Sequence, residues 1–153
     1  CFDYGIGVDV GERQLSGSER GRNERTEQVR QSVEHIESYL ASEDGASVCG
    51  IGGICDGALI AALVAARQPP TSKLRFYLNV CGTPWNWLPS ELRLPRPIAL
   101  PTLCLLGTAD EVLSEQELMS LPSRCTDVTI VRHDRGHALP VLKPRIADAL
   151  QRL

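Results

Sequence analysis

The chain has 153 residues, of which 42% are hydrophobic, and this predicts a single globular domain over residues 1–153. A disordered tail and a small disulfide-stapled scaffold are excluded. Sixteen basic and nineteen acidic residues give a formal net charge of -3, so we expect no nucleic-acid partner and no strong attraction to an anionic membrane. The longest apolar run, 58–66, is far shorter than the roughly 20 residues that span a bilayer. We therefore expect a soluble protein without a membrane span.

The first half of the chain predicts a loop and then an alternation of helix and strand. Residues 1–25 contain five glycines and a mixed run of Glu and Arg, which predicts a surface loop. Apolar residues then recur at steps of three and four, which predicts a helix over about 26–42. The small and apolar segment 46–51 is typical of a buried parallel strand. A Gly-rich turn follows it, and then an almost wholly apolar helix over 56–67.

The second half continues this alternation. Apolar runs predict strands over 74–80, 102–106 and 128–131. A capping box at Ser114 starts a short helix, and a last helix begins near Pro144. Strands that alternate with helices predict an α/β class with a parallel sheet of about four strands and helices on both faces.

The cysteines give no sign of a metal or redox motif. None of the six forms a C-x-x-C pair, and the dinucleotide and phosphate-loop patterns also fail, so we expect no cofactor. Cys49 and Cys104 lie in apolar runs, as free thiols of a reducing compartment do. We expect an intracellular, cytoplasmic protein, with a mitochondrial location as the alternative if a targeting segment has been removed.

The clearest chemical signal follows the first predicted strand. Gly53-Ile54-Cys55-Asp56-Gly57 matches the G-x-nucleophile-x-G pattern of a strand-to-helix elbow, with Cys in place of the commoner Ser. On such an elbow the nucleophile has positive φ, and the glycines let the two backbones approach closely. The helix N-terminus and a nearby imidazole would favour the thiolate of Cys55. The alternative interpretation is a Gly-rich turn with an inert buried thiol.

Two further residues with catalytic chemistry follow later strands, where parallel sheets gather reactive groups. Asp110 follows the third strand, with Glu111 as the competing acid, and His137 precedes the last helix. A carboxylate orients a histidine, which then acts as a general base. The chain order of nucleophile, acid and histidine is that of α/β-hydrolases. His133 and His137 form H-x-x-x-H, but without an evident third ligand we expect no metal there, and we expect His133 to be a supporting or surface residue.

These segments resemble the small serine hydrolases of the FSH type, in the α/β-hydrolase superfamily and related to carboxylesterases and dienelactone hydrolases. The resemblance implies a partial α/β-hydrolase fold and a hydrolase that acts on small-molecule esters or thioesters. By the same resemblance Cys55 is the nucleophile, Asp110 the acid and His137 the base. Family members usually have Ser as nucleophile, and Cys resembles the dienelactone hydrolases. The matching stretches are residues 2–4, 53–58, 100–112 and 136–140.

The sequence departs from this family in two ways. Asp56 follows the nucleophile, so its backbone N–H would serve the oxyanion hole while its carboxylate opposes the negative charge unless it turns away. The family's opening strands, which supply the second oxyanion donor, would lie before Cys1. An apolar strand at an open sheet edge invites pairing, so we expect another chain or a missing N-terminal segment to pair with the strand 46–51.

Two hypotheses about function remain open from the sequence. The first is an esterase or thioesterase with a cysteine nucleophile, whose acyl pocket is lined by Trp85, Trp87 and Leu88. The second is an inactive hydrolase-like structural or interaction subunit of a larger assembly, in which these apolar loop residues cover the core or a partner. Retention of Asp110 and His137 favours the enzyme.

Overall fold

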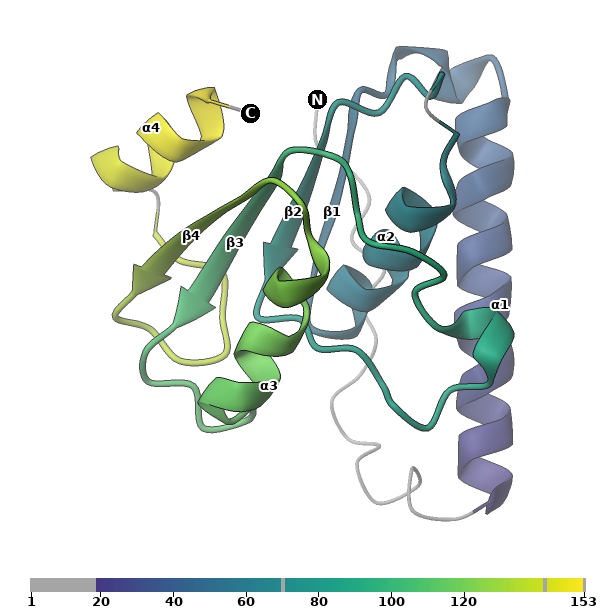
Figure 1. Cartoon of the computed structure of the whole chain (residues 1–153), viewed down its shortest axis with the longest axis horizontal. Coiled ribbons are helices and arrows are strands. Elements are labelled where there is room, and N and C mark those ends of the chain that lie inside the picture. Colours follow the sequence, from purple (N-terminus) through teal and green to yellow (C-terminus); the bar gives the residue numbers. More distant parts are fainter. Residues whose placement is uncertain (1–18, 70, 142, 153) are drawn as a thin grey trace.

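The sheet and helices are those of an α/β protein. The computed structural model describes residues 19–69, 71–141 and 143–152 (Figure 1). No helix in these ranges is both long and apolar enough to cross a membrane. In chain order the elements are α1 (Glu19–Ala41), the 3₁₀ turn η3 (Asp44–Ser47), β1 (Gly50–Ile54), α2 (Asp56–Arg67), β2 (Phe76–Val80), η4 (Ser90–Leu92), β3 (Thr102–Gly107), α3 (Glu115–Ser120), η5 (Pro122–Arg124), β4 (Val128–His133) and α4 (Pro144–Gln151).

The four strands form one parallel sheet in the order β1-β2-β3-β4. The inner strand β3 is buried along its whole length, whereas β1 pairs with β2 alone among the described strands. Because all strands run in one direction, their carboxyl ends meet at one edge of the sheet. The predicted α/β class and parallel sheet are confirmed.

Helices cover both faces of the sheet. Tyr77 of β2 faces α2, where its hydroxyl donates a hydrogen bond of 2.8 Å to the carbonyl of Ala58. Side chains alternate along a strand, so neighbouring positions point the other way. On that opposite face Val80 and Leu103 share an apolar cluster with Ile146 of α4. Figure 1 shows α4 on the far side of the sheet from α1 and α2.

The first helix is longer than the sequence indicated. It begins at Glu19, so the prediction of a surface loop up to residue 25 is wrong for 19–25, while 1–18 lie outside the described residues. Apolar periodicity begins only at Val29, which is buried, and it therefore marks the half of α1 that packs on α2. Apart from a glycine and an asparagine, the first turns consist mainly of Glu and Arg, which are strong helix formers, and surface ion pairs such as Arg20 to Glu24 at 2.9 Å join them.

The first strand begins later than predicted. Residues 46 and 47 lie in η3, and β1 starts at Gly50, so the predicted strand 46–51 was displaced. The cause is a close approach at Gly45, where a Cβ would lie 2.0 Å from the carbonyl oxygen of Tyr39. The chain therefore turns tightly beneath the end of α1 before it enters the sheet. β4 in turn extends to His133, which pairs with Gly107 of β3.

Candidate active site

The junction of β1 and α2 has the geometry of a nucleophile elbow. Cys55 has φ of 55° and ψ of -123°, and it is the residue that precedes the first turn of α2. A Cβ on Gly53 would lie 2.3 Å from the carbonyl carbon of Gly57, so only glycine fits at position 53. A Cβ on Gly57 would meet nothing within 4 Å. The predicted positive φ at Cys55 is confirmed, but the close approach requires only the first of the two glycines.

Asp110 and His137 form a buried pair. The ring atom Nδ1 of His137 lies 2.8 Å from Oδ2 of Asp110, whose side chain is 1% exposed. The other carboxylate oxygen accepts hydrogen bonds from the backbone N–H groups of Val112 (2.8 Å) and Leu113 (2.9 Å). Burial raises the pKa of Asp110, but these donors and His137 outweigh it and lower the pKa below its ordinary value. Asp110 is therefore ionised and orients the imidazole, whereas Glu111 is exposed.

Two glycines allow this pair to form. A Cβ on Gly107, at the end of β3, would lie 2.3 Å from the carbonyl oxygen of Gly136. A Cβ on Gly136 would lie 2.8 Å from the carbonyl oxygen of Ala109. The loops that follow β3 and β4 therefore touch backbone to backbone, and this contact brings residue 110 next to residue 137.

The second ring nitrogen of His137 has a free lone pair in the neutral ring. An ionised Asp110 accepts from Nδ1–H, so the neutral ring carries its lone pair on Nε2. This Nε2 atom is buried and has no hydrogen-bond partner among the described residues. The structure thus brings two of the three predicted catalytic residues together, and it leaves Cys55 without a hydrogen bond to the base.

Asp56 does not turn away from the elbow. Its Oδ1 lies 3.8 Å from the Sγ of Cys55, and its Oδ2 lies 3.4 Å from the guanidinium of Arg25 in α1. The guanidinium also lies 5.3 Å from the ring centroid of Trp85. Because the Arg25 and Asp56 side chains are only 15% and 22% exposed, their charges offset each other at close range. Arg25, which the sequence placed in a surface loop, therefore contacts the elbow.

A second cysteine, overlooked in the sequence, lies beside the acid and base. Cys81 follows β2, is fully buried, and has a φ of 47°. Its Sγ, a carboxylate oxygen of Asp110 and a ring nitrogen of His137 all lie within 4.8 Å of one another. Burial raises the pKa of the thiol, and the negative charge of Asp110 adds to this effect. The available signal was its position directly after a parallel strand and before Gly82.

His133 is a buried residue and not a surface one. It is 7% exposed, and neither ring nitrogen has a hydrogen-bond partner among the described residues. Burial lowers the pKa of this imidazole, which favours the neutral form. An unpartnered buried polar group is costly, so the side chain is a local weakness of the fold.

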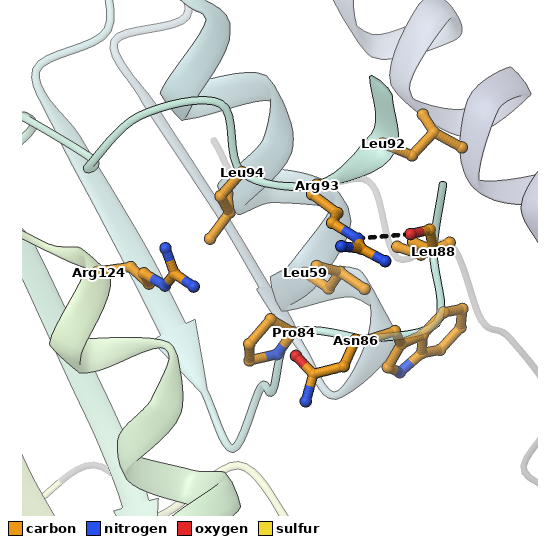
Figure 2. A pocket seen from close by; sticks show the side chains of 9 residues that line it. Leu59, Pro84, Asn86, Leu88, Leu92, Arg93, Leu94 and Arg124 are labelled. Carbon is orange, nitrogen blue, oxygen red and sulfur yellow. Dashed lines mark hydrogen bonds between the residues drawn. The ribbon is translucent and has the colours of Figure 1, made fainter. Parts of the chain in front are cut away.

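A pocket of about 330 Å³ lies over α2 (Figure 2). Trp85 and Leu88 line it, as does Leu59 of α2, while Trp87 stacks on Trp85 with ring centroids 5.1 Å apart and lines a separate hollow beside α1. Arg93 crosses the pocket and donates a hydrogen bond of 2.7 Å to the carbonyl of Leu88. The full lining is Leu59, Pro84, Trp85, Asn86, Leu88, Leu92, Arg93, Leu94 and Arg124.

The fold and site together define the class of protein. A parallel sheet, a positive-φ residue between a strand and a helix, and an acid and a histidine after later strands are the arrangement of α/β-hydrolases. The family model described as Serine hydrolase (FSH1) matches residues 13–149. The chain belongs to this serine hydrolase family.

Two relatives that the chain matches are named as esterases. The chain is 35% identical over 101 residues to human Esterase OVCA2, an alignment that covers 63% of this chain and 44% of the relative. It is 32% identical over 135 residues to the Bos taurus Esterase OVCA2. That alignment covers 82% of this chain and 54% of the relative. The chain therefore spans about half the length of these relatives.

Solved structures show the same fold at low identity. A predicted CIB-like hydrolase from Thermoplasma acidophilum superposes with a TM-score of 0.59 at 22% identity, over 82% of this chain and 60% of that one. Acyl-protein thioesterase 2 from Zea mays superposes with a TM-score of 0.52 at 20% identity, over 83% and 63%. At these identities the likeness concerns the fold.

Proposed function

We propose that this chain carries the catalytic residues of a hydrolase that cleaves carboxylic esters or thioesters through Cys55. The observation that supports this most strongly is the pair formed by His137 and Asp110, joined at 2.8 Å, which leaves the lone pair of Nε2 available. The positive φ of Cys55 supplies the second part, because an elbow presents its nucleophile clear of the strand.

The reaction follows from these positions. His137 Nε2 takes the thiol proton, and the Cys55 thiolate attacks the carbonyl carbon. The tetrahedral intermediate then collapses, the bond to the leaving alcohol or thiol breaks, and His137 returns the proton to that leaving group. Water, deprotonated by His137, next cleaves the acyl-enzyme, which releases the acid and restores Cys55. Asp110 stabilises the imidazolium in both halves of the reaction.

The nucleophile and the base must first come within hydrogen-bond reach. Catalytic hydrogen bonds are commonly long without substrate and tighten in the complex. The pocket beside Trp85 and Leu88 reaches Leu59, one turn of α2 beyond Cys55, but Cys55 and the acid and base do not line it. An acyl chain bound there would have to extend its carbonyl to the elbow. The apolar lining suits an acyl chain, and the charged Arg93 and Arg124 suit a polar end of the substrate.

The negative charge of the intermediate needs donors. The backbone N–H of Asp56 is one, since it lies in the first turn of α2, and Arg25 offsets the neighbouring carboxylate. We place the second donor on a segment that pairs with the open edge of β1, from the same polypeptide or from another chain. The exposure of Gly52 and Ile54 at this edge supports the pairing.

The Cys55→Ala variant tests the proposal. Removal of a nucleophile removes the covalent route, so hydrolysis of p-nitrophenyl acyl esters and acyl-CoA thioesters should fall by at least about 10³-fold. Cys125→Ala is the matched control, because Cys125 is a free half-buried thiol outside the site. Hydrolysis that survives in Cys55→Ala at the rate of the control would contradict the proposal.

The second candidate is a hydrolase fold that has lost its chemistry and serves in an assembly. One observation favours it: the Asp56 carboxylate lies 3.8 Å from the thiol of Cys55. This candidate predicts that the wild-type chain hydrolyses no faster than Cys55→Ala with any acyl substrate. The same pair of proteins therefore distinguishes the two candidates.

A further inference from the structure

Three different metal-ligating groups converge at the carboxyl ends of β2, β3 and β4. The Sγ of Cys81, a carboxylate oxygen of Asp110 and a ring nitrogen of His137 lie within 4.8 Å of one another. They follow β2, β3 and β4, so three adjacent strands fix their positions. Their sequence spacing matches no metal motif, because the sheet and not a local motif brings them together.

We propose that this group binds a zinc ion and that binding it stops hydrolysis. Thiolate sulfur, imidazole nitrogen and carboxylate oxygen are the three ligand types that zinc uses, whereas magnesium and calcium require oxygen ligands throughout. The inhibitory part of this inference rests on the proposed function; the binding part does not.

The spacing is close to that of a zinc site. Ligand atoms at the usual zinc bond lengths lie roughly 3.3 to 3.8 Å apart in a tetrahedral arrangement, so no pair in the observed group, all within 4.8 Å, has to contract by more than about 1.5 Å. The Asp110 carboxylate already accepts from the N–H groups of Val112 and Leu113, which provides the outer support that orients a metal ligand. Of the three side chains, His137 is the most exposed, at 15% against 1% for Asp110.

The protons balance in a way that explains the inhibition. The Cys81 thiol gives its proton to solvent when sulfur binds the ion, because zinc is bound by the thiolate. If Nδ1 of His137 becomes a ligand, the single ring proton moves to Nε2; if Nε2 does, its lone pair is occupied. In either case His137 no longer has a free lone pair to accept the proton of Cys55.

The neighbourhood separates Cys81 from the chain's other buried thiols. Burial raises the pKa of Cys104 to about 12. The group that contacts its sulfur is the side-chain amide of Asn79, which does not bind zinc in such sites. Cys125 and Cys81 each donate to a backbone carbonyl at 3.6 Å, that of Leu121 and that of Leu105, so this contact does not distinguish them. In the described part of the chain only Cys81 has both a carboxylate and an imidazole within ligating distance.

Binding of zinc alone, measured by competition with a chromophoric chelator on the EDTA-treated full chain, tests the first part. Removing a residue that only hydrogen-bonds to a metal ligand already lowers metal affinity by about 10- to 100-fold. Cys81→Ser removes a proposed ligand, so it should weaken zinc binding at least about tenfold. Cys125→Ser and Cys55→Ala should bind as the wild type does. Unchanged affinity in Cys81→Ser, or an equal loss in Cys55→Ala, would overturn the proposed site.

Hydrolysis in the presence of zinc tests the second part, with each variant compared with its own metal-free rate. Zinc should inhibit the wild type and Cys125→Ser, and the inhibitory concentration should rise at least about tenfold in Cys81→Ser. Equal inhibition of all three would overturn the assignment to Cys81. If the metal-free chain shows no hydrolysis, the proposed function fails while the binding measurement still decides the zinc site.

Cys81 is buried and has positive φ, so its substitution could prevent folding, and the folding of the variant has to be measured. Circular dichroism of Cys81→Ser establishes that it folds. Should it not fold, Asp110→Asn replaces it and is assessed by zinc binding only, with the same loss of at least about tenfold expected. Zinc should also raise the melting temperature of the wild type, because a ligand that binds only the folded state stabilises it.

Discussion

The two halves of the candidate site are built differently. The acid and base, Asp110 and His137, follow the buried strand β3 and its neighbour β4, are joined at 2.8 Å and are fixed by two further backbone hydrogen bonds to the carboxylate. The proposed nucleophile, Cys55, follows the edge strand β1, and its sulfur lies 3.8 Å from the carboxylate of Asp56. The first half is preorganised, and the second depends on its surroundings.

This difference separates a pair that the sheet alone assembles from an elbow that depends on a neighbouring helix. Backbone contacts within the sheet suffice to assemble Asp110 and His137, because Gly107 and Gly136 let their loops touch. The elbow needs a helix from outside the sheet, since α1 supplies Arg25 to offset Asp56. The elbow is therefore the half that a segment pairing with β1 would influence most.

The largest effect is expected in the preorganised half. Asp110→Asn keeps an acceptor for the N–H groups of Val112 and Leu113 but no longer stabilises the Nε2 tautomer or the imidazolium of His137. The kcat for ester hydrolysis should fall by about 10⁴-fold while the fold is retained. Steady-state kinetics together with circular dichroism measure this, and Glu111→Gln, which changes an exposed carboxylate, is the control. Equal rates for the two variants would show that the pair is structural only.

The next effect concerns the elbow backbone. In Gly53→Ala the new Cβ would lie 2.3 to 2.6 Å from backbone atoms of Gly57 and Ala58, which cannot move aside without shifting α2. Unfolding free energy should fall by about 3 kcal/mol. Gly57→Ala should be neutral or gain up to about 1 kcal/mol, because its Cβ meets nothing within 4 Å and glycine is a poor helix former. Urea denaturation measures both, and similar losses in the two variants would contradict the asymmetry.

A smaller effect is expected from the ion pair beneath the nucleophile. Arg25→Ala removes a positive charge beside the Asp56 carboxylate, near the thiol and the developing oxyanion, so kcat/KM should fall about tenfold, or 1.4 kcal/mol. Adding Asp56→Asn should restore most of the rate, which a loss of packing alone would not permit. Arg20→Ala is the control, because Arg20 pairs with Glu24 on the solvent-exposed face of the same helix. No rescue by Asp56→Asn would count against an electrostatic role.

The smallest effect concerns His133. Burial lowers its pKa, so the unfolded chain takes up a proton near its ordinary pKa of about 6.5 while the folded chain resists it. Stability from this residue is therefore present above that value and declines as the pH falls below it. His133→Leu should remove this decline and stabilise the chain at pH 5.5 by about 1 kcal/mol, since it replaces an unpartnered polar group. Urea denaturation at pH 7.5 and 5.5 measures the unfolding free energy of the wild type and of His133→Leu. The same pH dependence in both proteins would refute this role of His133.

The sequence predicted those parts of the fold that rest on local patterns. The apolar run from Ala58 to Ala66, the capping box at Ser114 and the proline at 144 placed α2, α3 and α4 correctly. The start of α1 was missed because its first turns bury almost nothing apolar. The start of β1 was missed because a close contact between Gly45 and Tyr39 sets it, and no local pattern reports such a contact.

The site divides in the same way. The order of residues 55, 110 and 137 after successive strands was visible in the sequence, and the structure confirms that the last two meet. Arg25 and Cys81 were missed because their importance arises from contacts across the fold: Arg25 reaches the elbow from another helix, and Cys81 lies beside the Asp110 and His137 pair.

The pH dependence of alkylation at Cys55 tests the central claim most directly. Iodoacetamide labelling of the native chain is read by peptide mass spectrometry, with Cys49 as the exposed control thiol. The account predicts that Cys55 reacts faster than Cys49 at neutral and mildly acidic pH, and that His137→Ala abolishes the difference. If Cys55 reacts no faster than Cys49, or reacts equally fast without His137, the elbow and the acid and base do not work together as a hydrolase site.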